Sequence, residues 1–277
     1  MVRRRAGLAL VLLLALFNTL GANADPHEHI VLASTTSTDN SGLFDYLLPT
    51  FEARTGIKVH VVARGTGQAI RIAKDGDADI LLVHHRRSEQ ELVAAGYALA
   101  RHEVMYNDFV IVGPRGDPAR INGMHDAVAA LGRIAAARAT FASRGDASGT
   151  HKAELALWRT AGIEADAAGA WYRETGSGMG ATLNIAAGMS AYALVDRATW
   201  LAFRNKGDLA ILAAGDPRLR NQYAVLAVNP ARHPHVRAVA AQTFLKWLTG
   251  PTGQAAIADF TIDGEQLFHP NAQETGR

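Results

Sequence analysis

Cysteine is absent from the 277-residue sequence. A chain without thiols has no disulfide framework, no thiolate metal site, no cysteine nucleophile and no cysteine to carry a lipid anchor. Charged residues are also sparse, at 19%, whereas 48% of the residues are apolar. This balance excludes disordered and coiled-coil proteins, and the length suits one large domain or two smaller ones with packed cores.

Apolar runs long enough to span a membrane are missing as well. The run Leu8–Phe17 falls well short of the roughly 20 residues that a spanning helix needs. It follows the basic residues Arg3–Arg5 and precedes Ala22-Asn23-Ala24, so residues 1–24 have the pattern of a signal peptide cleaved after Ala24. A retained membrane anchor is the alternative. We expect an exported protein that is free in the periplasm.

The chain has little net charge once this segment is set aside. The formal charge of the whole sequence is +2 at pH 7. Residues 1–24 hold three arginines and no acidic residue, so the chain from residue 25 onward has 25 basic and 26 acidic residues. A near-neutral chain offers no basic surface to nucleic acid, and we expect no nucleic-acid partner.

Short apolar runs alternate with longer amphipathic segments, which is typical of an α/β fold. The first three expected strands, His29–Ala33, Lys58–Ala63 and Asp79–Val83, are separated by helices. This order predicts parallel strands joined by right-handed crossovers.

Two longer apolar strands, near residues 109 and 225, interrupt this rhythm. They predict two α/β lobes joined by two crossover strands. Residues 25–108 and 222–277 would form a discontinuous first lobe, and residues 109–221 would form the second.

Three loops share one layout, in which a strand ends, Ser, Thr and Gly follow, and a helix begins. They are Ser34–Ser41, Gly65–Gly67 and Ser143–Thr150. The first N–H groups of a helix lack internal partners and carry partial positive charge, so such loops bind anions. Helix capping is the alternative for any one loop. Several hydroxyls and one arginine, Arg144, favour a shared oxyanion site at the carboxyl ends of the strands.

Other motifs carry less weight. Gly176-x-Gly178-x-x-Ala181 matches a dinucleotide fingerprint, but residues 171–175 before it do not resemble a buried strand. We expect the segment 177–180 to be a packing turn, and a fourth contribution to the oxyanion site is the alternative. His84 and His85 would point to opposite faces of a strand, which disfavours a metal site. Ser148 with His151 could serve an exported serine hydrolase, but neither a nucleophile elbow nor a positioned acid accompanies them.

Several segments resemble the tungstate-binding periplasmic proteins of ABC uptake systems, over about Ile30 to Asn229. The segments that carry the resemblance are Ser34–Leu43 (STTSTDNSGL), Gly65–Ala69 (GTGQA), Gly76–His84 (GDADILLVH), Val104–Pro114 (VMYNDFVIVGP), Ser143–Lys152 (SRGDASGTHK) and Gly178–Gly180. The resemblance implies a two-lobed type II periplasmic binding fold and a monomer that delivers its ligand to permease and ATPase subunits. It implies neither an enzyme nor a cofactor.

The resemblance also implies the ligand residues, which would hold tungstate in the cleft between the lobes. They are Thr35, Thr36, Ser37, Thr66, Arg144, Ser148, Gly149 and Thr150. These residues bind an oxyanion and no metal cation. Molybdate, or another tetrahedral oxyanion, is the alternative ligand.

Two further expectations concern charge. Arg144 would be the one side chain with full positive charge in the cleft, and Asp146 would orient it without touching the ligand. Arg64 departs from the family pattern, which has a small or apolar residue there. The third strand ends in Val83-His84, where related phosphate-binding proteins have a carboxylate, so the site would consist of donors and reject protonated phosphate.

Overall fold

The computed structural model describes residues 29–146, 148–165 and 169–272. The predicted signal peptide lies outside these residues. In the described part of the chain, no helix combines the length and the apolar character needed to cross a membrane.

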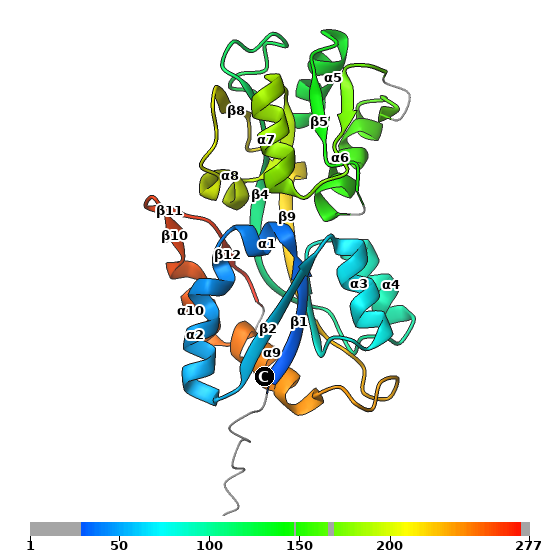
Figure 1. The fold of residues 1–277 in the computed structure, drawn as a ribbon, viewed down its shortest axis with the longest axis vertical. Coiled ribbons are helices and arrows are strands. Elements are labelled where there is room, and N and C mark those ends of the chain that lie inside the picture. Colours follow the sequence, from blue (N-terminus) through cyan, green and yellow to red (C-terminus); the bar gives the residue numbers. More distant parts are fainter. Residues whose placement is uncertain (1–28, 147, 166–168, 273–277) are drawn as a thin grey trace, which may run out of the picture.

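A sheet whose parallel strands lie at one end forms the first lobe (Figure 1). β1 (His29–Thr35) pairs in parallel with β2 (Lys58–Arg64) and β3 (Ile80–Val83). Because the three strands run the same way, their carboxyl ends meet at the edge that faces the second lobe. The helices of this lobe are α1 (Thr36–Asn40), α2 (Leu43–Thr55), α3 (Thr66–Asp75), α4 (Arg86–Ala94), α9 (Ala238–Thr249) and α10 (Pro251–Asp259).

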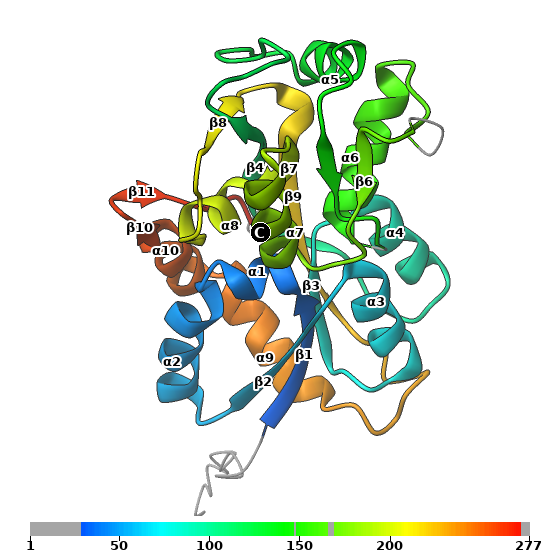
Figure 2. The same cartoon turned by 45° about the horizontal axis from the view of Figure 1, so that its top comes forward.

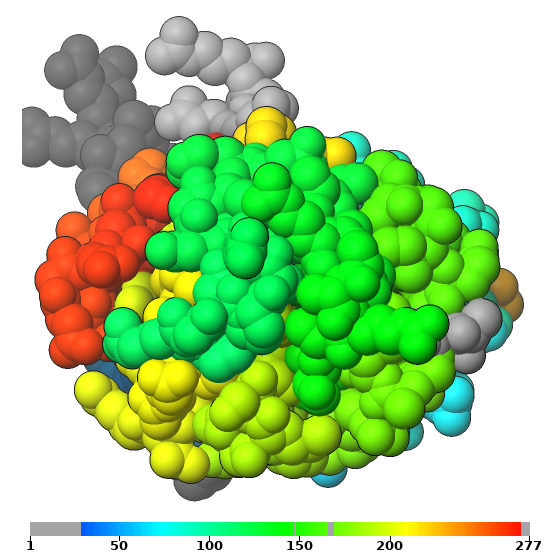
Figure 3. All heavy atoms as spheres, turned by 90° about the horizontal axis from the view of Figure 1, so that it is seen from above, coloured from blue at the N-terminus to red at the C-terminus, as the bar shows by residue number. Residues whose placement is uncertain are grey.

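The second lobe has its own strands, helices and core. β5 (Phe141–Ser143) pairs in parallel with β6 (Tyr172–Glu174), and its core packs Phe141 edge-on against Trp158. Seen from its far end, this lobe forms most of the surface, with the C-terminal segment at one edge (Figure 3). Its other elements are α5 (Ala127–Ala136), α6 (Gly149–Thr160), α7 (Met179–Met189), β7 (Ala193–Asp196), α8 (Arg197–Ala202), β8 (Leu209–Ala213) and a 3-10 turn at Pro217–Leu219.

Two antiparallel strands connect the lobes. β4 (His102–Pro114) pairs with β9 (Arg220–Ala227) from His102 to Asp108, and the rest of β4 pairs with β7 and β8 of the second lobe. The structure thus has two α/β lobes and two crossover strands. The division of the chain at residues 108 and 222 stays a prediction.

Several local expectations were wrong. The segment Ser34–Ser41, expected as a loop, ends β1 and forms α1, because Thr35 accepts a hydrogen bond from the Thr38 N–H and caps a helical turn that has no apolar periodicity. A strand, β6, does precede Gly176, although Arg173 and Glu174 in it are exposed. Unpredicted elements are α8, α10 and three two-residue strands, β10 (Thr261–Ile262), β11 (Glu265–Gln266) and β12 (His269–Pro270).

Candidate oxyanion site

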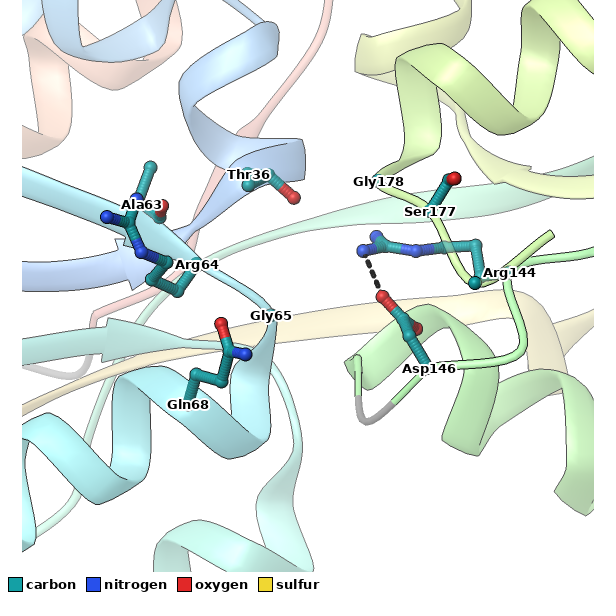
Figure 4. A pocket seen from close by; sticks show the side chains of 10 residues that line it. Thr36, Ala63, Arg64, Gly65, Gln68, Arg144, Asp146, Ser177 and Gly178 are labelled. Atoms are coloured by element: carbon teal, nitrogen blue, oxygen red, sulfur yellow. Dashed lines mark hydrogen bonds and ion pairs between the residues drawn. The ribbon is translucent and has the colours of Figure 1, made fainter.

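A cavity of about 300 Å³ lies where the two lobes face each other. Figure 2 shows α1 and α3 of the first lobe opposite α6 and α7 of the second, and Figure 4 shows the lining side chains reaching in from both sides. The first lobe contributes Thr36, Ala63, Arg64, Gly65 and Gln68, and the second contributes Arg144, Asp146, Gly176, Ser177 and Gly178. The cavity therefore sits at the ends of β1, β2 and β5, as the loop layout predicts, and also at the end of β6.

Arg144 is the buried cation of this cavity. Its side chain is 3% exposed and its Nη2 donates to Asp146 Oδ2 at 2.6 Å. The other carboxylate oxygen of Asp146 accepts the Ser148 N–H at 3.1 Å. This contact confirms that Asp146 orients the guanidinium, which points toward the Thr36 hydroxyl across the gap (Figure 4). Both oxygens of Asp146 are thus occupied by protein donors.

Three of the predicted ligand residues carry a buried donor that has no partner within the described residues: Thr36 Oγ1, Thr150 Oγ1 and Arg144 Nε. The described chain holds seven such buried side-chain atoms in all, so the predicted site accounts for nearly half of them. Leaving a buried donor unsatisfied costs about 1–3 kcal/mol. An oxyanion that accepted from these groups would remove this cost.

Two other predicted hydroxyls already accept hydrogen bonds within the protein. Thr66 Oγ1 accepts the Gly149 N–H at 2.8 Å, a hydrogen bond between the lobes. Ser148 Oγ accepts the His151 N–H at 3.1 Å and so caps α6. The His151 ring is hydrogen-bonded to Ser143 Oγ at 3.1 Å. These contacts account for Ser148 and His151 without the nucleophile and base pair of a serine hydrolase. Ligand binding by the eight residues stays a prediction.

His84 follows β3 and is buried behind the first loop. Its Nε2 lies 3.3 Å from Ser37 Oγ, and its Nδ1 lies 2.8 Å from Asn221 Oδ1. Burial lowers its pKa to about 4, so the ring is neutral near pH 7. His85 has different partners, since its ring caps α4 by accepting the Ser88 N–H.

Two expectations about the cavity lining are corrected. The Gly176–Gly178 segment lines the cavity, because the Ser177 N–H donates to the Arg144 carbonyl oxygen at 3.2 Å and draws this loop alongside. Its Ser and Gly residues before α7 repeat the layout of the other three loops, a signal that predicts this position. Arg64 also lines the cavity, with Nη1 donating to the Ala63 carbonyl oxygen at 2.8 Å. Arg144 is therefore not alone as a cation there.

Fold and site together define a two-lobed, type II periplasmic solute-binding protein. Residues 21–252 match the model of the PBP superfamily domain. A tungstate-binding protein, TupA of Peptoclostridium acidaminophilum, is 47% identical over 247 residues, which cover 88% of this chain and 86% of that protein.

Two solved structures are also similar. One is the tungstate-binding protein TupA of Desulfovibrio alaskensis G20, with 45% identity and a TM-score of 0.77 over 89% of this chain and 100% of that one. The other is the tungstate ABC transporter protein of Geobacter sulfurreducens, with 46% identity and a TM-score of 0.78 over 84% and 99%. The chain belongs to the PBP superfamily and, within it, to the family of tungstate-binding proteins of ABC transporters.

Proposed function

We propose that this protein captures tungstate between its lobes and delivers it to the permease and ATPase subunits of an ABC transporter. Its family membership supports this role. The observation that carries it is the set of buried, unpartnered donors on Thr36, Thr150 and Arg144. Tungstate is a fully ionised dianion that accepts hydrogen bonds at all four oxygens, so these donors suit it.

The proposed site comprises Thr35, Thr36, Ser37, Thr66, Arg144, Ser148, Gly149 and Thr150. In this proposal Thr36, Thr150 and Arg144 donate to the anion, and the remaining residues hold the loops that carry them. Molybdate has the same charge and tetrahedral shape, so we propose that it binds the same donors. The proposal includes no catalytic step.

We also propose that the chain is exported, cleaved after Ala24 and active as a monomer in the periplasm. A periplasmic location places the site on the side of the membrane from which an uptake system collects its ligand.

Calorimetric titration of the purified protein with tungstate, molybdate, sulfate and phosphate tests the function. We expect tungstate and molybdate to bind, and phosphate to bind far more weakly because its own hydroxyl would remain a buried, unsatisfied donor. Sulfate, being smaller, would leave the hydrogen bonds too long. Phosphate binding comparable to that of tungstate would contradict the proposal.

Arg144→Ala provides the matched variant. A hydrogen bond to a charged group contributes about 1.5–3 kcal/mol, so we expect tungstate to bind at least about tenfold more weakly. Arg173→Ala is the control, since Arg173 is an exposed arginine of the same lobe outside the cavity lining. Unchanged affinity in Arg144→Ala would rule out the proposed site.

A further inference from the structure

A line of buried hydrogen bonds runs from the first ligand loop to the two crossover strands through His84. Ser37 Oγ lies 3.3 Å from His84 Nε2, and His84 Nδ1 lies 2.8 Å from Asn221 Oδ1 on β9. Asn221 Nδ2 then donates to Asn107 Oδ1 on β4 at 2.8 Å. All four residues are buried. The line therefore links a predicted ligand residue to both strands that connect the lobes.

The partners of His84 fix where its proton lies. An amide oxygen only accepts, so Nδ1 must carry the hydrogen that Asn221 Oδ1 receives. In a neutral imidazole the other nitrogen, Nε2, is then an acceptor. The group that faces Nε2 is the Ser37 hydroxyl, which must therefore donate its single proton to the ring.

The neighbouring hydroxyls follow from this direction. Thr35 Oγ1 lies 3.1 Å from Ser37 Oγ and 2.7 Å from Thr38 Oγ1. Because the Ser37 proton goes to His84, Thr35 donates to Ser37 and Thr38 donates to Thr35. These three hydroxyl protons are used within the protein. The Thr36 hydroxyl, which lies between them in sequence and lines the cavity, is left with its proton free to donate.

Packing holds the ring in this position. The imidazole stacks on Tyr223 with ring centroids 4.8 Å apart. On the side of the second lobe it meets Gly149, where an added Cβ would lie 2.9 Å from His84 Cε1. His84 thus touches the first and third ligand-bearing loops as well as the crossover strands.

We propose that His84 is a positioning residue of the anion site. As the tautomer with the proton on Nδ1, it takes the Ser37 hydroxyl proton, so that in the first loop Thr36, rather than Thr35 or Ser37, donates to the tetrahedral oxyanion. The identity of the oxyanion rests on the proposed function, whereas the tautomer does not.

The tautomer can be measured without any ligand. In the ¹⁵N-labelled protein we expect a one-bond N–H coupling at His84 Nδ1 and none at Nε2, with the resonances assigned from a His84→Gln spectrum. A proton on Nε2 would overturn the proposal whether or not the protein binds tungstate. The result does not depend on whether any variant binds the ligand.

Calorimetry with tungstate tests the consequence for the hydroxyls. We expect Thr36→Ala to weaken binding by about tenfold, and Ser37→Ala to weaken it by at most about threefold. His84→Phe keeps the stacked ring but removes both hydrogen bonds, so its loss of affinity should be larger in the parent protein than in the Ser37→Ala background. His125→Gln, an exposed histidine of the second lobe, is the control and should bind as the parent does.

Each outcome has a distinct meaning. Equal losses in Ser37→Ala and Thr36→Ala would show that Ser37 donates to the anion, and would overturn the proposal. A parent protein that did not bind tungstate would contradict the proposed function while leaving the tautomer measurement valid. If His84→Phe failed to fold, the comparison of Thr36→Ala with Ser37→Ala would still decide.

Discussion

Arg64 and Arg144 place two guanidinium groups at one cavity in different surroundings. Arg144 is buried and held by Asp146, whereas Arg64 is exposed on the rim. A buried charge interacts strongly over short distances, while an exposed charge contributes a longer-range field that salt screens. We therefore expect Arg144 to set the affinity and Arg64 to set the rate of capture.

Arg64→Ala should lower the association rate constant for tungstate by about threefold at low ionic strength and change it little at about 0.5 M salt. The dissociation rate should stay as in the parent protein. Stopped-flow kinetics at several salt concentrations measure both rates, with Arg54→Ala at the far end of α2 as the control. A change confined to dissociation would instead place Arg64 in contact with the anion.

At the scale of elements, the N-caps of α5 and α6 can be compared because each side chain accepts the N–H group three residues further on. Asp126 accepts the Ala129 N–H at 2.9 Å at the start of α5, and Ser148 accepts the His151 N–H at 3.1 Å at the start of α6. Only Ser148 belongs to a ligand loop, where its own N–H also holds Asp146. Substituting each cap in turn therefore distinguishes an effect on helix stability from an effect on ligand binding.

Ser148→Ala should lower the free energy of unfolding by about 1 kcal/mol, the usual value of such a cap, and Asp126→Ala should lower it as well. Ser148→Ala should also weaken tungstate binding, because its loop orients Arg144 through Asp146. Urea denaturation and calorimetry on both variants measure the two effects. Equal losses of affinity would mean that the cap has no specific link to the site.

Helices and strands with a clear apolar periodicity could be predicted from the sequence. Elements that depend on a particular hydrogen bond in the folded protein could not. The strand expected at Asp79–Val83, for example, matches β3 to within one residue. α1 lacks such a pattern and exists because Thr35 caps it. Likewise, the loop layout indicated the cavity, but which hydroxyls are free depends on distant partners. Thr66 Oγ1, for example, accepts the N–H of Gly149, 83 residues away.

At the scale of the whole molecule, donors on opposite lobes face one cavity. Thr36 reaches it from the first lobe and Arg144 from the second. An anion that contacts both must draw the lobes together, and the strands that can bend between them are β4 and β9. We expect the hinges near Asn107–Val112 and Tyr223–Val228.

Small-angle X-ray scattering should show a smaller radius of gyration when tungstate is added. Arg144→Ala at the same tungstate concentration serves as the control and should contract less. An unchanged radius in the parent protein would indicate a rigid cleft or a ligand held by one lobe.

His84 in the first lobe and Glu154 in the second are buried titratable groups whose pKa shifts oppose each other. Burial lowers the pKa of His84 from 6.5 to about 4 and raises the pKa of Glu154 from 4.5 to about 7. As pH falls from 6.5 to 4.5, unfolded His84 gains a proton that the folded state excludes, which lowers the free energy of unfolding. Over the same range folded Glu154 gains a proton that the unfolded state lacks, which raises it. Each effect approaches about 3 kcal/mol, so they nearly cancel.

Single substitutions should expose each contribution. In Glu154→Gln the free energy of unfolding should fall as pH drops from 6.5 to 4.5, and in His84→Gln it should rise. Urea denaturation at several pH values measures this dependence against the parent protein. Parallel curves for all three proteins would show that neither group titrates in this range.

Tungstate affinity should stay nearly flat from about pH 6 to 9, since His84 remains neutral there.

The discontinuous first lobe has a consequence for the order in which the protein folds. Its core packs Phe51 edge-on against Phe244 with ring centroids 5.0 Å apart, although almost two hundred residues separate them. The core of the second lobe instead draws on one continuous stretch, from Phe109 to Leu219. A chain that emerges from its N-terminus therefore completes the second lobe first, while Phe51 waits for the segment that carries Phe244. Until then we expect the N-terminal strands to expose apolar surface that favours aggregation.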